Sequence, residues 1–121
     1  MNEIQGLVRD KIHEGKLEEF KRLAAKCMDS VRTKDSGTLQ YDWFFNADET
    51  ECVVHERYRD SDALLEHVAN LGDTMGALLQ TCSISGELFG TPSPQLLKAL
   101  EGFDVRIYSP YQSFRPRVQA S

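Results

Sequence analysis

A carboxylate, a phenol and an imidazole lie close together in this chain of 121 residues, at Glu56, Tyr58 and His67. Glu56 and Tyr58 are two residues apart, so in a β-strand both side chains point to the same face. A glutamate in an apolar pocket has a raised pKa and can accept a proton near neutral pH, and an imidazole can hold or move one. These three are the candidate catalytic residues, suited to deprotonating a phenol or an enol.

His67 is the sharpest of these candidates because of its place on a predicted helix. It follows Leu64 by three residues and precedes Leu71 by four, with Val68 beside it, so it belongs to the apolar, inward face of that helix. An inward imidazole can orient a substrate or transfer a proton. The alternative is a core histidine whose ring is bonded to a backbone carbonyl, and the residues alone favour that alternative.

Aromatic side chains follow the two-residue period of a strand at Leu39, Tyr41, Trp43 and Phe45. With Glu56 and Tyr58 they predict the wall of a cavity between sheet and helices, a setting that suits a planar organic molecule. The alternative is an ordinary aromatic core, in which Glu56 pairs with Arg57 or with an arginine of a partner chain. The candidate substrate-binding residues are Tyr41, Trp43, Leu64, Val68 and Leu71.

The elements that must position these residues follow from the periodicity of apolar side chains. Strands are expected at residues 4–12, 38–45, 52–58, 83–89 and 103–107, and helices at 16–33, 60–71, 74–81 and 95–100. With the second and third helices taken as one unit, the order β-α-β-β-α-β predicts a ferredoxin-like α+β fold, an antiparallel sheet with helices on one face. One domain is expected over residues 1–121, with a core at about 4–90, a helix-strand extension at about 91–114 and a tail at 115–121.

The hairpin at residues 38–58 carries large side chains on both faces. Tyr41, Trp43 and Val54 share one face, and Phe44 and Val53 share the other. One layer of helices covers only one face of a sheet, so a monomer would expose an apolar patch. We therefore expect two copies of the chain to pair as a homodimer. The alternative is that the chain's own tail half covers the second face.

Three segments of the chain carry a resemblance to a known family: residues 37–41 (GTLQY), 53–60 (VVHERYRD) and 63–67 (ALLEH). They are similar to the Gly-x-Leu-x-Tyr, Glu-Arg-Trp and Ala-Leu-x-x-His signature of the antibiotic biosynthesis monooxygenase (ABM) superfamily. The resemblance covers roughly residues 4–90 in element order. It implies a dimeric α+β barrel and, in characterised members, oxidation of quinol- or anthrone-like aromatics with molecular oxygen and no cofactor.

The sequence departs from this pattern at Tyr58, where the family has tryptophan. Haem-degrading relatives use that tryptophan, an asparagine on the first strand and a helix histidine. Here the first-strand position falls near Val8 and only His67 remains, so haem degradation is disfavoured. The expected function is a cofactor-independent monooxygenase acting on a small aromatic or quinol-like compound. The alternatives are a non-catalytic ligand-binding or structural dimer, and an isomerase or decarboxylase on the same scaffold.

Composition argues against several other classes of function. The net charge of −5 disfavours nucleic acid as a partner, and no apolar run approaches the roughly 20 residues that a membrane span needs. The first residues lack the basic and apolar regions of a signal peptide, which favours the cytoplasm. Cys27, Cys52 and Cys82 are expected as reduced, buried thiols, because neither CxxC nor a Cys/His spacing predicts a metal site.

Overall fold

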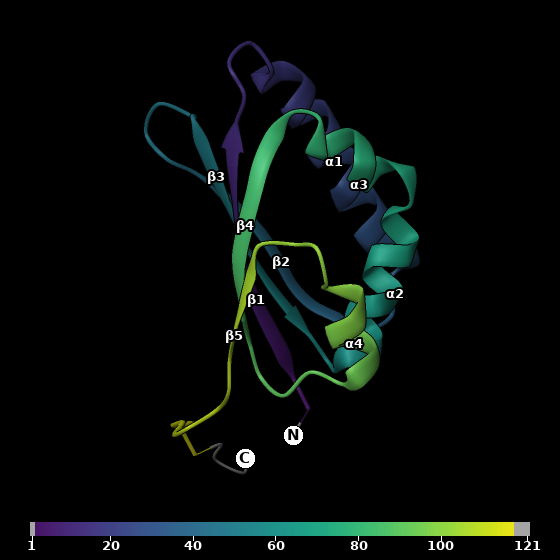
Figure 1. Ribbon diagram of the computed structural model, residues 1–121, viewed down its shortest axis with the longest axis vertical. Helices are drawn as coiled ribbons and strands as arrows, with labels where there is room; N and C mark the ends of the chain where they lie inside the picture. Colours follow the sequence, from purple (N-terminus) through teal and green to yellow (C-terminus); the bar gives the residue numbers. More distant parts are fainter. Residues whose placement is uncertain (1, 118–121) are drawn as a thin grey trace.

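The computed structural model describes residues 2–117 as a five-stranded sheet packed against helices (Figure 1). The strands are β1 (Ile4–Ile12), β2 (Thr38–Phe45), β3 (Glu51–Tyr58), β4 (Cys82–Phe89) and β5 (Val105–Tyr108). The helices are α1 (Leu17–Lys34), α2 (Ser61–Leu71), α3 (Asp73–Leu79) and α4 (Pro94–Ala99). The spatial order is β2-β3-β1-β4-β5, in which β1 to β4 pair antiparallel and β5 pairs parallel to β4.

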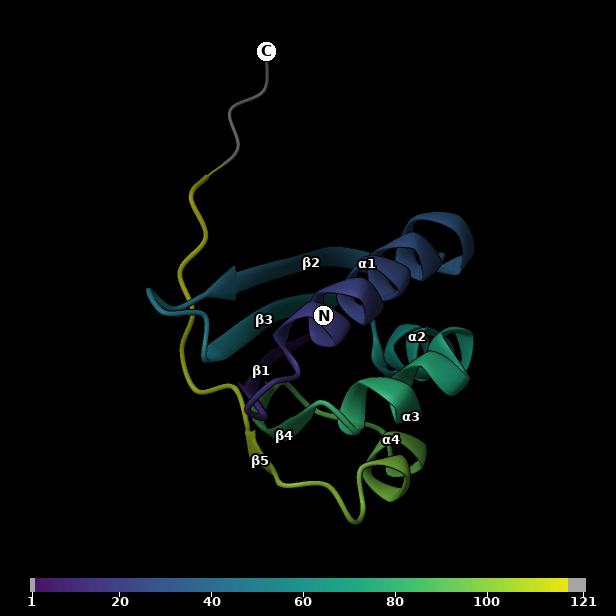
Figure 2. The ribbon, with the colours of Figure 1, turned by 90° about the horizontal axis from the view of Figure 1, so that it is seen from above.

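The helices lie together on one face of the sheet, as the view from above shows (Figure 2). This arrangement confirms the predicted ferredoxin-like α+β fold with its helix-strand extension. The expected tail at residues 115–121 is described only as far as Arg117, and the rest lies outside the described residues. None of the helices between residues 2 and 117 is long and apolar enough to cross a membrane.

Helix ends in this fold follow simple electrostatic rules. α1 carries Glu18 and Glu19 in its first turn and Arg32 and Lys34 in its last, the charges that the helix dipole favours at each end. α2 begins after Asp60, whose side chain accepts a hydrogen bond of 2.9 Å from the backbone N–H of Ala63. These local signals favour the observed ends of α1 and the observed start of α2, and burial of the apolar face of each helix holds it on the sheet.

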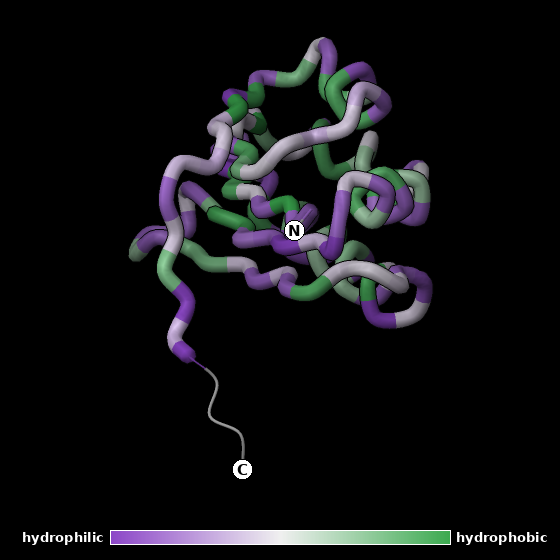
Figure 3. Tube along the Cα trace, turned by 90° about the horizontal axis from the view of Figure 1, so that it is seen from below, coloured by the Kyte–Doolittle hydropathy of each residue, from purple (hydrophilic) through white to green (hydrophobic). Residues whose placement is uncertain are grey.

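Two clusters of buried side chains join the helices to the sheet. One includes Phe20 of α1, Val54 of β3 and Leu78 of α3, and the other includes Ile4 of β1 and Leu96 of α4. Apolar segments, green in Figure 3, recur in strands and helices and alternate with polar ones. The core is therefore divided between the two ends of the sheet.

Leu39 departs from the face predicted for it. The pairing of β2 with β3 shifts between Thr38 and Gln40, so Leu39 falls at an irregularity of the strand and is 51% exposed. A bulge of this kind breaks the alternation of side chains. Tyr41 and Trp43, which follow the irregularity, keep the inward face.

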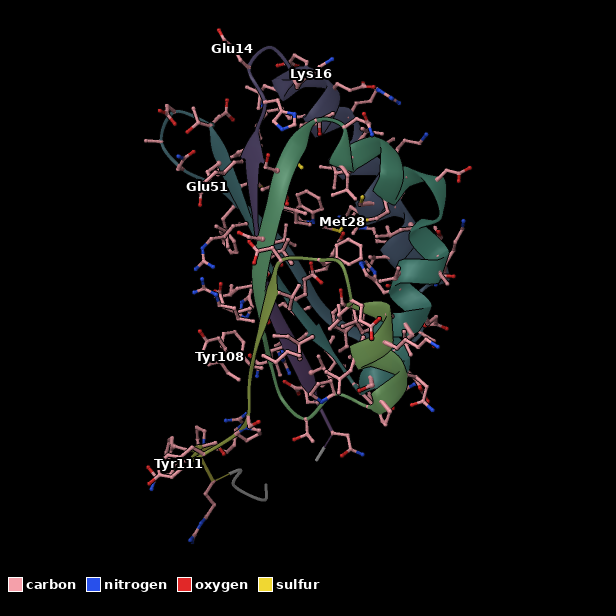
Figure 4. The ribbon with its side chains drawn as sticks, in the orientation of Figure 1. Glu14, Lys16, Met28, Glu51, Tyr108 and Tyr111 are labelled. Atoms are coloured by element: carbon pink, nitrogen blue, oxygen red, sulfur yellow. The ribbon has the colours of Figure 1, made fainter. Side chains whose placement is uncertain are left out.

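No helix covers the other face of the sheet within residues 2–117 (Figure 2). Phe44 is 56% exposed there, and Glu51 and Tyr108 point away from the helices (Figure 4). Beyond β5 the chain runs off the sheet through Tyr111, which is 91% exposed. The second face of the hairpin is thus apolar in part and open, as its sequence pattern predicts.

Gly37 lies where the start of β2 meets the first turn of α2. A Cβ atom at this position would stand 2.5 Å from the Cβ of Ala63, closer than two carbon atoms can approach. The backbone oxygen of Gly37 also accepts a hydrogen bond of 2.9 Å from the backbone N–H of Arg59. The glycine at residue 37 and the alanine at residue 63, which belong to two separate family-like segments, are therefore partners in one close contact between α2 and the sheet.

Replacing Gly37 with alanine should lower the free energy of unfolding by about 1–3 kcal/mol, because α2 must move away from β2. Urea denaturation followed by circular dichroism measures this loss. Gly76→Ala is the matched control: Gly76 lies within α3 with nothing near its missing side chain, and alanine there should stabilise by up to about 1 kcal/mol. An equal loss in both variants would contradict the contact as the cause.

Candidate active site

A cavity of about 180 Å³ lies between the sheet and helices α2, α3 and α4. Its lining is mostly apolar and draws on both core clusters. Gly6 of β1 and Gly86 of β4 face it, so two neighbouring strands present no side chain at their centres. A Cβ atom at Gly6 would find its nearest neighbours 3.8 and 4.0 Å away, which is ordinary contact. A larger residue at position 6 would therefore fill part of the cavity, whereas a Cβ atom at Gly86 would stand 2.7 Å from the backbone oxygen of Leu7, too close for any side chain.

Glu56 borders this cavity from the middle of β3. Its carboxylate accepts a hydrogen bond from the hydroxyl of Tyr58, two residues along the same face. Burial raises the pKa of Glu56 to about 7, against the hydrogen bond from Tyr58, and the nearby carboxyl group of Asp10 raises it further. Burial also raises the pKa of Tyr58 well above its usual value, so the phenol stays protonated and acts as a donor. Glu56 can thus exchange a proton near neutral pH.

His67 faces the same cavity from α2, and Asp35 fixes its ring. Nδ1 of His67 lies 2.8 Å from Oδ2 of Asp35, which also accepts a hydrogen bond of 2.7 Å from Thr38, while Oδ1 accepts one of 2.9 Å from Asn70. The ring's partner is thus a side-chain carboxylate rather than the backbone carbonyl of the alternative interpretation. Its ring centroid stands 5.0 Å from that of Tyr41.

The protonation of this pair follows from burial and hydrogen bonding. Burial lowers the pKa of His67, although Asp35 opposes the change. Burial acts to raise the pKa of Asp35, but hydrogen bonds from Asn70, Thr38 and His67 outweigh it and the pKa is lowered. A neutral imidazole therefore donates from Nδ1 to a carboxylate, and Nε2 is left as an acceptor.

The five candidate substrate-binding residues come together around the cavity. Tyr41 and Trp43 line it from β2, and Leu64, Val68 and Leu71 line it from α2. Val68 is 45% exposed, so it lies at the edge of the cavity, whereas the other four are largely buried.

The pairing of Glu56 with Arg57, which the sequence left open, is wrong. Arg57 points to the opposite face of β3 and binds Glu3 through two hydrogen bonds of 3.0 and 3.2 Å. On that outer face His55 lies 3.1 Å from the side chain of Gln40. The charged groups of β3 are therefore divided, with Glu56 alone on the cavity side.

Asp10 is a cavity residue that sequence reasoning missed. It is 1% exposed, and its Oδ1 atom has no hydrogen-bond partner among the described residues. Burial raises the pKa of its carboxyl group to about 7. The signal was present in the sequence, because Ile4, Val8 and Ile12 mark the inward register of β1 and Asp10 is an acid in that register.

Within residues 2–117, no group of three or more histidine, cysteine, aspartate and glutamate side chains is placed to hold a metal ion. Cys27, Cys52 and Cys82 are buried and free. Burial raises the pKa of all three thiols, that of Cys27 to about 11. The polar side chains that line the cavity include those of Asp10, Tyr41, Glu56, Tyr58 and His67.

A family model described as antibiotic biosynthesis monooxygenase matches residues 7–72, more than half of the chain. The chain belongs to this family. The match runs from within β1 to the end of α2, and so includes Asp10, Glu56 and His67. A search of curated proteins found no match.

Solved structures of the same fold extend the comparison. MupZ from Pseudomonas fluorescens is 25% identical, with a TM-score of 0.78, and the match covers 99% of this chain and 100% of that one. SnoaB from Streptomyces nogalater, a cofactor-independent oxygenase, is 19% identical with a TM-score of 0.66, and the match covers 77% and 96%. Rv0793 from Mycobacterium tuberculosis is 20% identical with a TM-score of 0.65, covering 72% and 92%. The likeness to MupZ thus takes in the C-terminal extension as well.

Asp10→Asn should stabilise the protein most at high pH. The folded pKa of Asp10 is raised from 3.8 to about 7, so the wild type loses stability as pH rises through that range, and the asparagine variant does not. Between pH 4 and pH 8 the difference in free energy of unfolding should widen in favour of the variant by about 4 kcal/mol.

Chemical denaturation at the two pH values measures that difference. Asp104→Asn, at an exposed aspartate, is the matched control and should change the free energy of unfolding little at either pH. An Asp10→Asn variant that is less stable than wild type at pH 8 would contradict an unpartnered carboxyl group.

Proposed function

We propose that the protein is a cofactor-independent monooxygenase that oxidises a small aromatic or quinol-like compound with molecular oxygen. The observation that carries this proposal is Glu56, a carboxyl group with a pKa of about 7 at the wall of an apolar cavity. Membership of the antibiotic biosynthesis monooxygenase family supports it, as does the likeness of fold to SnoaB, a cofactor-independent oxygenase.

The first step is removal of a proton by ionised Glu56, from a phenol or from a carbon atom that an aromatic ring activates. The anion that forms gives an electron to oxygen, so the reaction needs neither flavin nor metal. Apolar walls exclude water, which strengthens the electrostatic interactions at the reacting atoms. Tyr58 holds the carboxylate of Glu56 in place, and Tyr41, whose pKa burial raises, stays a hydrogen-bond donor for a substrate oxygen.

His67 is proposed to orient the substrate. Its Nδ1 is held by Asp35, so Nε2 is free to accept a hydrogen bond from a substrate hydroxyl. Size limits the substrate as well: an apolar cavity of about 150 Å³ binds benzene, so one of about 180 Å³ fits a single substituted ring. Hydroquinones are therefore better candidate substrates than three-ring anthrones.

A second candidate function is proton-transfer chemistry without oxygen, such as isomerisation or decarboxylation of a small compound. The observation that favours it is a second carboxyl group, Asp10, with a pKa of about 7 in the same cavity. Two groups that titrate near neutral pH can take and give protons without any oxidant. The replacement of the family's tryptophan by Tyr58 is compatible with this change of chemistry.

We also propose that two copies of the chain pair through the outer face of the sheet. Phe44 follows the inward-facing Trp43 on β2, so the alternation of a strand places it on this outer face, where it is exposed. Tyr108 on β5 is also exposed and points away from the helices (Figure 4). Burial of such a face is favourable in proportion to its apolar area. Sedimentation at micromolar concentration tests the pairing, and a monomer would contradict it.

Glu56→Gln should abolish oxygen uptake with hydroquinones, because glutamine cannot accept the proton. In the wild type the rate should rise with pH on the acid side of about 7, as Glu56 ionises. An oxygen electrode measures both. Glu51→Gln, on the same strand but pointing away from the helices, is the matched control and should keep the wild-type rate (Figure 4). Uptake that survives Glu56→Gln would rule out the proposed base.

His67→Ala should slow the same reaction by about tenfold or more, since the substrate loses its oriented acceptor. His55→Ala removes a histidine from the outer face of β3 and should leave the rate unchanged. If the wild type binds aromatic ligands but takes up no oxygen, the result favours the non-catalytic or the oxygen-independent alternative. Equal rates in the two variants would contradict a role for His67 in turnover.

A further inference from the structure

We propose that Asp10 is a second residue that contacts the substrate, and that its carboxyl group gives a proton to a substrate oxygen while Glu56 takes one from the substrate. This inference rests on the proposed function only in placing the substrate in the cavity. A contact with Asp10 adds a second polar group to a cavity otherwise defined by Glu56, Tyr58 and His67. The substrate must then carry a second oxygen that can accept a proton from Asp10.

The two carboxyl groups reach one cavity from different positions. Glu56 on β3 pairs with Gly6 on β1, and Asp10 stands four residues further along β1, opposite Cys52. Both side chains lie on the face of the sheet that the helices cover. At roughly 3.3 Å per residue the two positions are about 13 Å apart along the sheet. These are backbone positions, and the carboxyl groups themselves are close enough that Asp10 raises the pKa of Glu56, so one ligand in the cavity can contact both.

Asp10 also lacks the partners that the other buried acids have. Glu56 accepts a hydrogen bond from Tyr58, and Asp35 accepts three. Oδ1 of Asp10 is buried with no partner among the described residues, although burial of an unpaired carboxyl group costs free energy. A ligand oxygen that accepts its proton would remove this cost.

A second unpartnered atom lies in the same lining. The indole Nε1 of Trp43 is buried and has no acceptor within residues 2–117, and Trp43 lines the cavity as Asp10 does. These two are the unpartnered buried side-chain N or O atoms of the described chain. Their common place in the cavity lining indicates a ligand that carries polar atoms of its own.

The titratable groups near Asp10 do not oppose the effect of burial on its carboxyl group. The charge of Asp10 raises the pKa values of groups on β3, β2, α1 and β4. These groups are the carboxyl of Glu56, the phenol of Tyr41 and the thiols of Cys27, Cys52 and Cys82. None of these is a cation, so nothing favours the ionised form. Burial therefore raises the pKa of Asp10 to about 7, and the carboxylic acid is available as a donor.

Protons and electrons balance for a hydroquinone. Glu56 removes the proton of one hydroxyl group, and the electron pair of the resulting phenolate, delocalised to the neighbouring ring carbon, bonds that carbon to O2, giving a peroxide anion beside a new carbonyl group. Asp10 gives its proton to the terminal peroxide oxygen. The O–O bond then breaks as Asp10 recovers the proton of the carbon that carries the peroxide, and the departing hydroxide takes the proton held by Glu56. A hydroxyquinone and water form, and both carboxyl groups return to their initial states.

Binding of simple probes tests the contact independently of turnover. Trp43, the single tryptophan of the chain, lines the cavity, so its fluorescence reports occupancy. Without oxygen, the wild type should bind hydroquinone about tenfold more tightly than phenol, since only hydroquinone offers a second oxygen. Asp10→Leu should bind the two equally. Asp42→Leu, at an exposed position of β2, should keep the preference.

Turnover tests the proton transfer. Oxygen uptake by the wild type should rise and then fall with pH around 7, because Glu56 must be ionised and Asp10 protonated. Asp10→Asn keeps a hydrogen-bond donor but has no proton to give. It should lower kcat about a hundredfold with little change in KM, and the fall at high pH should disappear.

The outcomes separate the inference from the function on which it rests. No uptake by the wild type would reject the monooxygenase, and the binding comparison would still decide the role of Asp10. A hydroquinone preference that survives Asp10→Leu, or failure of the wild type to bind either probe, would overturn the contact. Unchanged kcat and pH profile in Asp10→Asn would overturn the proton transfer. Circular dichroism of each variant confirms that it has folded.

Discussion

The carboxylate of Asp35 is the interaction on which the rest of the site depends. It follows the last turn of α1 and accepts hydrogen bonds from Thr38 at the start of β2 and from His67 and Asn70 on α2. One buried carboxylate thus joins three elements that are distant in sequence. The hydrogen bonds from its partners lower its pKa and favour its ionised form. Together with the close contact between Gly37 and Ala63, the Asp35 carboxylate sets the distance between α2 and the sheet. That distance determines the position of the α2 side chains that line the cavity.

Much of this could be predicted from the sequence, because alternation along strands and apolar spacing along helices are local properties. Glu56 and Tyr58 share a face for that reason, and His67 faces inward for the corresponding helical reason. Asp35 could not be found in this way: it follows a helix as an ordinary stop signal, and its partners lie elsewhere in the chain. The exposure of Leu39 depends on a β-bulge that the residue types of β2 do not predict. Asp10 was within reach, since register alone places it inside.

The cavity exists because the core does not close at the centre of the sheet. Gly6 and Gly86 on adjacent strands contribute no side chain to the cavity lining. Filling the space beside Gly6 would stabilise the protein, as would removal of the buried carboxyl group of Asp10. A fold that retains both an open space and an unpaired acid gives up stability at the place where a ligand can bind.

The protonation of the three buried thiols bears on the chemical stability of such a cavity. Cys27 lines it, and burial raises the pKa of Cys27 to about 11, so the sulfur is a thiol rather than a thiolate at neutral pH. Thiolates are the form that adds to quinones and reacts with peroxides, and protonated thiols are far less nucleophilic. Under the proposed function, a quinone formed in this cavity would meet a protonated thiol, which adds to it far less readily than a thiolate does. The apolar surroundings that are proposed to admit an aromatic substrate would thus also make the nearest sulfur less reactive towards the oxidised product.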